Sequence, residues 1–157
     1  HTGVPKSNQI WSAAALIDPK YHSHVVHAHK TYMECGAHII TTNNYACTPY
    51  YLAKIGMKHH VESLTKLCVS LAHQARDEFV IQRKHNLSDN HHCAKIQIAG
   101  SIPPLNESYR ADLRLSEQAS INCYSRIVQS LQGGKGVDIF LIETMSCLEE
   151  ALYALRA

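Results

Sequence analysis

The sequence lacks the features that would assign it at once to a membrane-bound, secreted or nucleic-acid-binding class. Its 157 residues contain no apolar run near the roughly 20 residues that a membrane span needs, and no hydrophobic signal-peptide core. The formal net charge is only +2, and the basic residues are scattered rather than clustered. We therefore expect no membrane partner and no nucleic-acid partner.

Paired cysteines are also missing. The six cysteines are dispersed, and the sequence contains neither a Cys-x-x-Cys motif nor a Cys-Cys pair. Isolated free cysteines commonly behave as small buried hydrophobes, and reduced cysteines are typical of intracellular proteins. We therefore expect a cytoplasmic protein whose thiols stay reduced.

What the sequence does contain is an alternation of helix and strand signals. Helices are predicted where apolar residues recur three and four positions apart, and strands where short β-rich runs lie between them. The first helix begins at Asp18-Pro19 and its apolar residues form one stripe: Tyr21, Val25, Ala28, Tyr32 and Cys35. The last begins at a capping box formed by Ser146 and Glu149. The predicted helices cover residues 18–36, 61–82, 116–133 and 146–157, and the predicted strands cover residues 37–42, 94–99 and 137–142.

This order predicts an α/β fold with a parallel sheet buried on both faces. A parallel sheet of three strands would leave two bare edges, which soluble domains rarely tolerate. The pattern therefore indicates a part of something larger. A doubly wound sheet and a closed barrel are both compatible with it.

Polar residues follow each predicted strand, where ligands bind in parallel α/β folds. The three strand ends read Thr41-Thr42-Asn43-Asn44-Tyr45, Ala99-Gly100-Ser101 and Glu143-Thr144-Met145. Glu143 is placed to receive an ammonium group or to act as a general base. Its alternative role is that of a charge partner for the dipole of the following helix.

These residues resemble the homocysteine S-methyltransferase family. The segments that carry the resemblance are Trp11-Ser12-Ala13, residues 32–37, residues 39–45, residues 99–105 with 107–110, and residues 142–145 with 149–151. The resemblance implies an eight-stranded (β/α)8 barrel, of which this chain supplies strands two, three and four with their helices. Residues 1–157 would then form part of a single homocysteine-binding barrel domain that lacks strand one and strands five to eight.

The resemblance also implies an activity and a set of site residues. The family transfers a methyl group to the thiol of homocysteine, giving methionine, from a donor such as S-methylmethionine, S-adenosylmethionine or betaine. Glu143 would hold the amino group of homocysteine. Asn43 and Tyr45 would line the pocket after strand two, and Ser101 would lie beside them after strand three.

Zinc is the cofactor that the resemblance implies. The family binds it through three cysteines after strands six and eight, and zinc favours the thiolate form of a thiol whose pKa is otherwise about 8.5. The sequence contains none of these ligands, and Asn122-Cys123 lies inside a predicted helix. We therefore expect no metal ligand here and no catalysis by this chain alone. The alternatives are an inactive truncated barrel fragment with a structural or partner-dependent role, and an unrelated barrel lyase that uses Glu143 as a base.

Other chemistry-bearing residues are interpreted as structural. His22, His24, His27 and His29 are expected on a solvated helix surface, and His91-His92-Cys93 in a polar loop, because a structural zinc site needs four converging ligands. Cys47 and Cys147 follow strands, but ordinary free thiols are favoured over an improvised metal or redox site. Tyr50-Tyr51 is expected to pack on the barrel rim.

Overall fold

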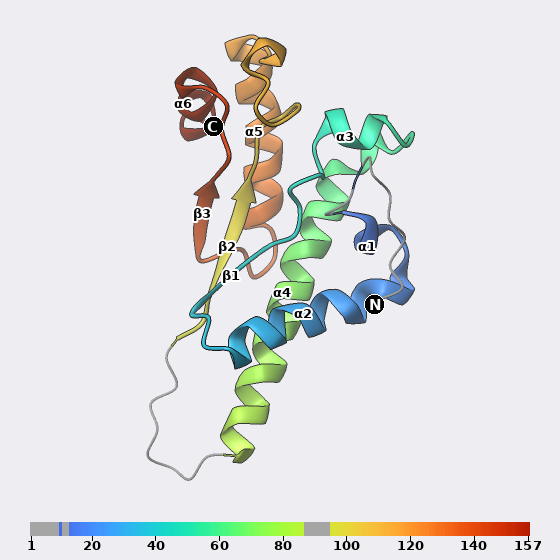
Figure 1. Cartoon of the computed structure of the whole chain (residues 1–157), viewed down its shortest axis with the longest axis vertical. Coiled ribbons are helices and arrows are strands. Elements are labelled where there is room, and N and C mark those ends of the chain that lie inside the picture. The colour runs from blue at the N-terminus through green and yellow to red at the C-terminus, as the bar shows by residue number, and fades with distance from the viewer. Residues whose placement is uncertain (1–9, 11–12, 87–94) are drawn as a thin grey trace.

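The structure is a computed structural model that describes Ile10, residues 13–86 and residues 95–157. It confirms the predicted alternation of helices and strands (Figure 1). Within the described residues, no helix is both long enough and apolar enough to cross a membrane. The elements, with η marking 3-10 helices, are α1 (Ala14–Ile17), η1 (Pro19–Tyr21), α2 (His22–Glu34), β1 (Ile39–Thr41), α3 (Pro49–Ala53), η2 (Lys58–His60), α4 (Val61–Asn86), β2 (Gln97–Ile102), η3 (Ala111–Leu113), α5 (Glu117–Gln132), β3 (Ile139–Ile142) and α6 (Leu148–Leu155).

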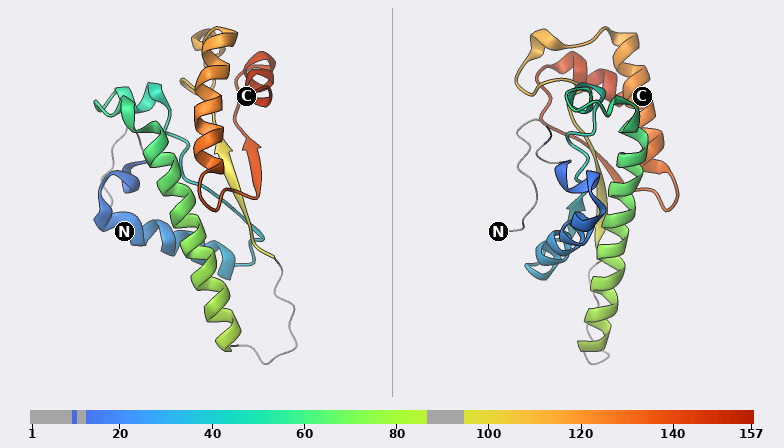
Figure 2. Two further views of the ribbon diagram at one scale, coloured as in Figure 1. Left: turned by 180° about the vertical axis from the view of Figure 1, so that it is seen from behind. Right: turned by 90° about the vertical axis from the view of Figure 1, so that its right-hand side faces the viewer.

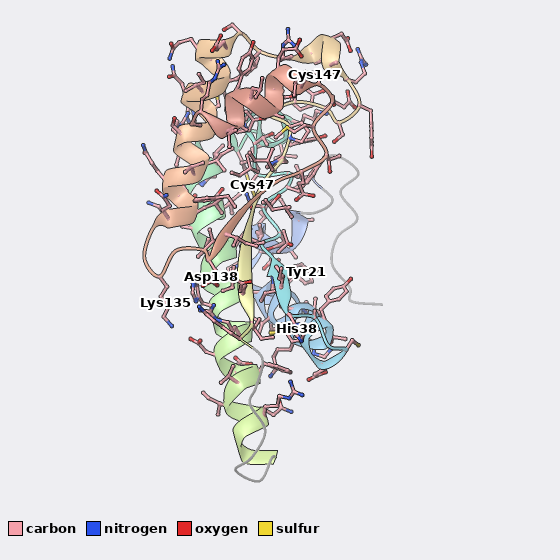
Figure 3. The ribbon with its side chains drawn as sticks, turned by 90° about the vertical axis from the view of Figure 1, so that its left-hand side faces the viewer. Tyr21, His38, Cys47, Lys135, Asp138 and Cys147 are labelled. Atoms are coloured by element: carbon pink, nitrogen blue, oxygen red, sulfur yellow. The ribbon has the colours of Figure 1, made fainter. Side chains whose placement is uncertain are left out.

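The strands form one parallel sheet in the order β1-β2-β3. Helices α4 and α5 lie on one face of it, as the view from behind shows (Figure 2). The approach of α5 is close, because a Cβ added to Gly100 would lie 2.9 Å from Cδ1 of Leu131. Cys147, after β3, lies near the top of the molecule in Figure 3, whereas Asp138, before β3, lies near its middle.

The expectation of a sheet buried on both faces holds for β2 but is wrong for β1 and β3. Successive residues point to opposite faces. On the helix side Ile40, Ile98 and Ile102 are buried, whereas Phe140, which pairs with Gly100 on the same side, is 43% exposed. On the opposite face, Ile39 is 49% exposed and Leu141 is 38% exposed. The register pairs Ser101 with Leu141, so the side chain of Ser101 belongs to this less covered face.

Helix α4 forms the centre of the core, and its stripe is predicted correctly. Val61, Leu64, Cys68, Leu71 and Ala75 are all buried. The helix continues to Asn86, beyond the predicted end near Gln82. The predicted loop that follows falls largely on residues 87–94, outside the described residues.

The predicted stripe of α2 is largely wrong. Tyr32 is 67% exposed, whereas His29 is only 8% exposed and is buried together with Val26 and Met33. The reason is that α2 packs against α4 through this neighbouring stripe. The expected solvated position of His29 is therefore also wrong.

Two boundaries near the candidate site differ from the prediction. β2 begins later and extends through Ser101 to Ile102, so Ser101 is the penultimate residue of the strand. The predicted capping box is absent, because Cys147 is the N-cap of α6 and the buried hydroxyl of Ser146 has no hydrogen-bond partner.

Candidate functional site

Ser101 and Glu143 meet at the carboxyl ends of β2 and β3. The Ser101 hydroxyl donates a hydrogen bond to Oε1 of Glu143 over 2.6 Å. Ser101 is buried and Glu143 is half-buried, so a ligand can still reach the carboxylate. A carboxylate has about four acceptor positions, of which the Ser101 hydroxyl occupies one. The pair is therefore suited to receive a cationic group.

The alternative role of Glu143, as a charge partner for the dipole of α6, is filled by other residues. The first turn of α6 contains Glu149 and Glu150. Glu149 also pairs with Arg114 over 3.1 Å. Two carboxylates already complement the N-terminus of this helix, which favours the ligand-facing interpretation of Glu143.

The residue after Glu143 has an unusual backbone conformation. Thr144 has a φ of 56°, in the left-handed region. This region costs a residue with a Cβ about 1–2 kcal/mol, and strained residues of this kind concentrate at functional sites. The left-handed residue lies just after the end of β3, directly after Glu143.

Two residues outside the predicted set, Thr42 and Asn44, hold Ser101. Its N–H donates to Oγ1 of Thr42 over 3.0 Å, and its carbonyl accepts from Nδ2 of Asn44 over 2.9 Å. Thr42 in turn donates to Oδ1 of Asn44 over 2.7 Å. Residues 40, 42 and 44 are all buried, so the alternation of buried residues in β1 continues past the end of the strand. This alternation is the signal that distinguishes Asn44 from its neighbour Asn43.

The other two predicted site residues are Asn43 and Tyr45. The hydroxyl of Tyr45 lies 2.5 Å from Oγ of Ser108, which ties the segment after β1 to the loop after β2. Asn43 borders a groove between α2 and β1. The hydrogen bonds thus join Ser101 directly to Glu143, while Tyr45 is joined to Ser108.

The groove between α2 and β1 is apolar and has a volume of about 520 Å³. Val25, Tyr32 and Ile39 are among the residues that line it. His29 also lines it, and Nε2 of this side chain is buried without a hydrogen-bond partner. Burial lowers the pKa of His29, because the charged imidazolium would lose its water.

The buried carboxylate of Glu150 anchors the loop after β2. Glu150 is 4% exposed, and its Oε1 accepts a hydrogen bond from the Leu105 N–H over 3.1 Å. The Tyr124 hydroxyl lies 3.2 Å from the same oxygen and 3.2 Å from the carbonyl of Pro103. These contacts fasten the loop after β2 to α5 and α6.

The structure describes five of the cysteines, and all five are free thiols. Cys47 and Cys68 are buried side by side, while Cys147 accepts a hydrogen bond from Arg114 over 3.5 Å. Tyr50 and Tyr51 pack edge to face with ring centroids 5.2 Å apart.

Within the described part of the chain, no group of three or more His, Cys, Asp or Glu side chains could hold a metal ion. His91-His92-Cys93 lies outside the described residues. The described residues therefore do not fit the zinc site that the resemblance implies.

The fold and the site define an α/β protein with polar side chains gathered at the carboxyl ends of a parallel sheet. The crystal structure of the homocysteine methyltransferase MmuM from Escherichia coli, in its metallated form, has the same fold. The TM-score is 0.78 at 24% sequence identity, and the match covers 96% of this chain and 52% of that one. The oxidized form of the same protein matches equally well, with a TM-score of 0.78.

Sequence comparisons identify the family. The family model described as Homocysteine S-methyltransferase matches residues 3–157, so the chain belongs to the homocysteine S-methyltransferase family. Homocysteine S-methyltransferase YbgG of Bacillus subtilis (strain 168) is 29% identical over an alignment of 162 positions, gaps included, that covers 98% of this chain and 49% of that protein. Homocysteine S-methyltransferase 1 of Zea mays is 37% identical over 79 residues, which are 49% of this chain and 24% of that protein. The chain thus spans about half the length of the Bacillus relative.

Proposed function

We propose that the protein to which these residues belong transfers a methyl group to the sulfur of homocysteine, giving methionine. Its sheet then supplies strands two to four of a (β/α)8 barrel, and residues 1–157 form part of one barrel domain. The observation that carries this proposal is the Ser101–Glu143 pair, 2.6 Å apart at the carboxyl end of the sheet, in a member of this family.

In this proposal Glu143 binds the α-ammonium group of homocysteine. An ammonium–carboxylate pair is a charge-assisted hydrogen bond, worth about 1.5–3 kcal/mol where water is partly excluded. The Ser101 hydroxyl holds Oε1 and so fixes the plane of the carboxylate. Asn43 and Tyr45 contribute to the wall on the β1 side of the pocket.

The reaction forms a sulfur–methyl bond on homocysteine and breaks the bond between the methyl group and its donor. The donor keeps the bonding electron pair, and the thiol proton of homocysteine is released. S-methylmethionine, S-adenosylmethionine and betaine each carry a methyl group on a positively charged sulfur or nitrogen that can leave in this way. The role of residues 1–157 is to recognise the amino acid, and we expect a chain of this length alone neither to bind zinc tightly nor to turn over.

Binding measurements on the 157-residue chain test the recognition step. Calorimetry should show tighter binding of L-homocysteine than of 4-mercaptobutanoate, which lacks only the ammonium group. Glu143→Gln should weaken homocysteine binding about tenfold or more, since one charge-assisted contact is lost. Glu117→Gln is the matched control, because Glu117 pairs with Arg156 on the outer helices. Equal affinity for both ligands would count against the proposal.

Turnover gives a second, independent test. Methionine formation from homocysteine and S-methylmethionine should be absent in a preparation whose intact mass matches the 17.6 kDa chain. Stoichiometric zinc together with turnover in that preparation would contradict the division of roles proposed here.

A further inference from the structure

The junction between β1 and β2 departs from a regular ladder at the candidate site. The last register pair is Thr41 with Ala99, and the Thr42 N–H still donates to the Ala99 carbonyl over 2.9 Å. In a regular parallel ladder, the Ser101 N–H would next donate to the backbone carbonyl of residue 42, and the Ser101 carbonyl would accept from the N–H of residue 44. The side chains of Thr42 and Asn44 make both bonds instead.

In this arrangement the polar groups of both side chains are used in hydrogen bonds. The Thr42 oxygen accepts from the Ser101 N–H and donates its proton to Oδ1 of Asn44, while the Asn44 amide donates to the Ser101 carbonyl. Thr42 is 2% exposed, and Asn44 and Ser101 are each 1% exposed. Buried hydrogen bonds of this kind are strong, and leaving one partner unpaired is costly.

The chain of bonds ends on Glu143. The N–H and the carbonyl of Ser101 are both bonded to side chains that follow β1. Its remaining polar group, the hydroxyl, donates to Oε1 of Glu143. Three consecutive strand ends are thereby linked in one line: the segment after β1, the end of β2 and the end of β3. A shift of Thr42 or Asn44 would be transmitted to the carboxylate through Ser101.

We propose that Thr42 and Asn44 are positioning residues that set selectivity for the ammonium group of the substrate. They act through Ser101 on Glu143 and do not themselves contact the substrate. This inference rests on the proposed function for its substrate. It predicts that disturbing the network removes discrimination between an amino acid and its des-amino analogue, rather than weakening every ligand equally.

The test compares isosteric and conservative variants of the 157-residue chain. Thr42→Val keeps the shape of the side chain and removes the hydroxyl, whereas Thr42→Ser retains it. Asn44→Leu removes both amide contacts at similar volume and is the second route if Thr42→Val does not fold. Thr65→Val is the matched control, because Thr65 is fully buried and its hydroxyl has no hydrogen-bond partner.

The readout is the ratio of affinities for L-homocysteine and 4-mercaptobutanoate, measured by calorimetry. Thr42→Val and Asn44→Leu should reduce this ratio about tenfold. Thr42→Ser should restore most of it, and Thr65→Val should leave it unchanged. A ratio that stays at the wild-type value in folded Thr42→Val, or equal losses for both ligands, overturns the inference.

A second readout separates failure of this inference from failure of the proposed function. If wild-type chain binds neither ligand, the recognition step of the proposed function fails, and the network is then judged by nuclear magnetic resonance. Thr42→Val should speed hydrogen exchange of the Ser101 amide about tenfold or more and shift the side-chain carboxyl resonance of Glu143. Unchanged signals for both residues would overturn the positioning role whatever the chain binds.

Discussion

The phenolic oxygen of Tyr124 lies 3.2 Å from Oε1 of Glu150, which joins α5 to α6 inside the protein. Tyr124 is fully buried, and Glu150 is 4% exposed. Burial, followed by the neighbouring Glu150 carboxylate, raises the pKa of Tyr124 well above its ordinary value, so the hydroxyl keeps its proton. The same carboxylate oxygen accepts from the Leu105 N–H, so one pair controls both helix packing and the loop after β2.

Tyr124→Phe should therefore lower the free energy of unfolding by about 1–2 kcal/mol, the cost of removing one buried donor. Urea denaturation at neutral pH measures the change. Tyr32→Phe is the control, because Tyr32 is 67% exposed and its substitution should be nearly neutral. A double variant with Glu150→Gln should cost less than the sum of the single changes, because both remove the same interaction.

Asp138 provides a prediction for pH dependence. Its Oδ2 accepts from the Ile98 N–H over 2.8 Å and from Arg76 over 2.8 Å. The Ile98 N–H first, and Arg76 after it, hold the pKa of Asp138 below its ordinary value. A lowered folded-state pKa means that the stabilisation is present above the unfolded-state pKa of about 3.9 and is lost as the pH falls through the folded-state value.

Asp138→Ala should accordingly destabilise the protein by roughly 1–2 kcal/mol at pH 7 and by much less near pH 2–3. Urea denaturation of wild type and variant across this range gives the difference at each pH. Asp112→Ala is the control, since Asp112 pairs with Arg110 on the surface and its side chain is 62% exposed. A constant difference between wild type and Asp138→Ala at every pH would show that the carboxylate charge is not the cause.

The fold was predictable where one periodic signal dominated. The α4 stripe from Val61 to Ala75 is long and regular, so its buried face followed from spacing alone. On α2 two apolar stripes compete, and the choice between Tyr32 and Met33 depends on where α4 lies, which is a tertiary fact. The exposure of Phe140 and Leu141, on opposite faces of β3, was unpredictable for the same reason, because an apolar run does not show how much of the strand its neighbours cover.

The candidate site was predictable as a place but not as a network. Polar residues after each strand located it, and Ser101 and Glu143 do form a hydrogen bond. Asn43 and Asn44 are the same residue type, yet Asn43 borders the groove and Asn44 bonds to Ser101. Only the alternation of buried positions that continues from β1 distinguishes them. The sequence run could not reveal that side chains would replace backbone groups in the ladder.

Cysteine reactivity gives a third prediction. Burial, together with the adjacent Cys47 thiol, raises the pKa of Cys68 well above its ordinary value, and both residues are nearly inaccessible. In native protein at pH 8, iodoacetamide should modify exposed Cys35 about a hundredfold faster than Cys68, because the thiolate is the reacting species. Peptide mass spectrometry measures the rates, and denaturing urea should bring them close together. Comparable rates in native protein would mean that Cys68 is neither protonated nor sealed as described.

Thr144 gives the final prediction, in which stability and binding should change in opposite directions. Its left-handed backbone, with a φ of 56°, is strained for a β-branched residue, and its side chain is exposed. Thr144→Gly should release about 1–2 kcal/mol of strain, offset by about 0.5–1 kcal/mol from the greater freedom of glycine in the unfolded chain. The net result is a gain of up to about 1.5 kcal/mol in the free energy of unfolding, measured with urea. Thr31→Gly, at an exposed position in the ordinary helical conformation of α2, should instead lose stability.

The same Thr144→Gly change should weaken homocysteine binding. Glu143 precedes this turn, and a more mobile glycine would let its carboxylate leave the position that Ser101 defines. The strained conformation of Thr144 lowers stability. Its presence is accounted for if it positions the adjacent Glu143 carboxylate. The affinity is measured by calorimetry on the same preparation. A rise in stability with reduced affinity would connect the turn at Thr144 to the position of Glu143. A rise in stability with unchanged affinity would assign the strain to the path of the chain from β3 into α6 and not to the site.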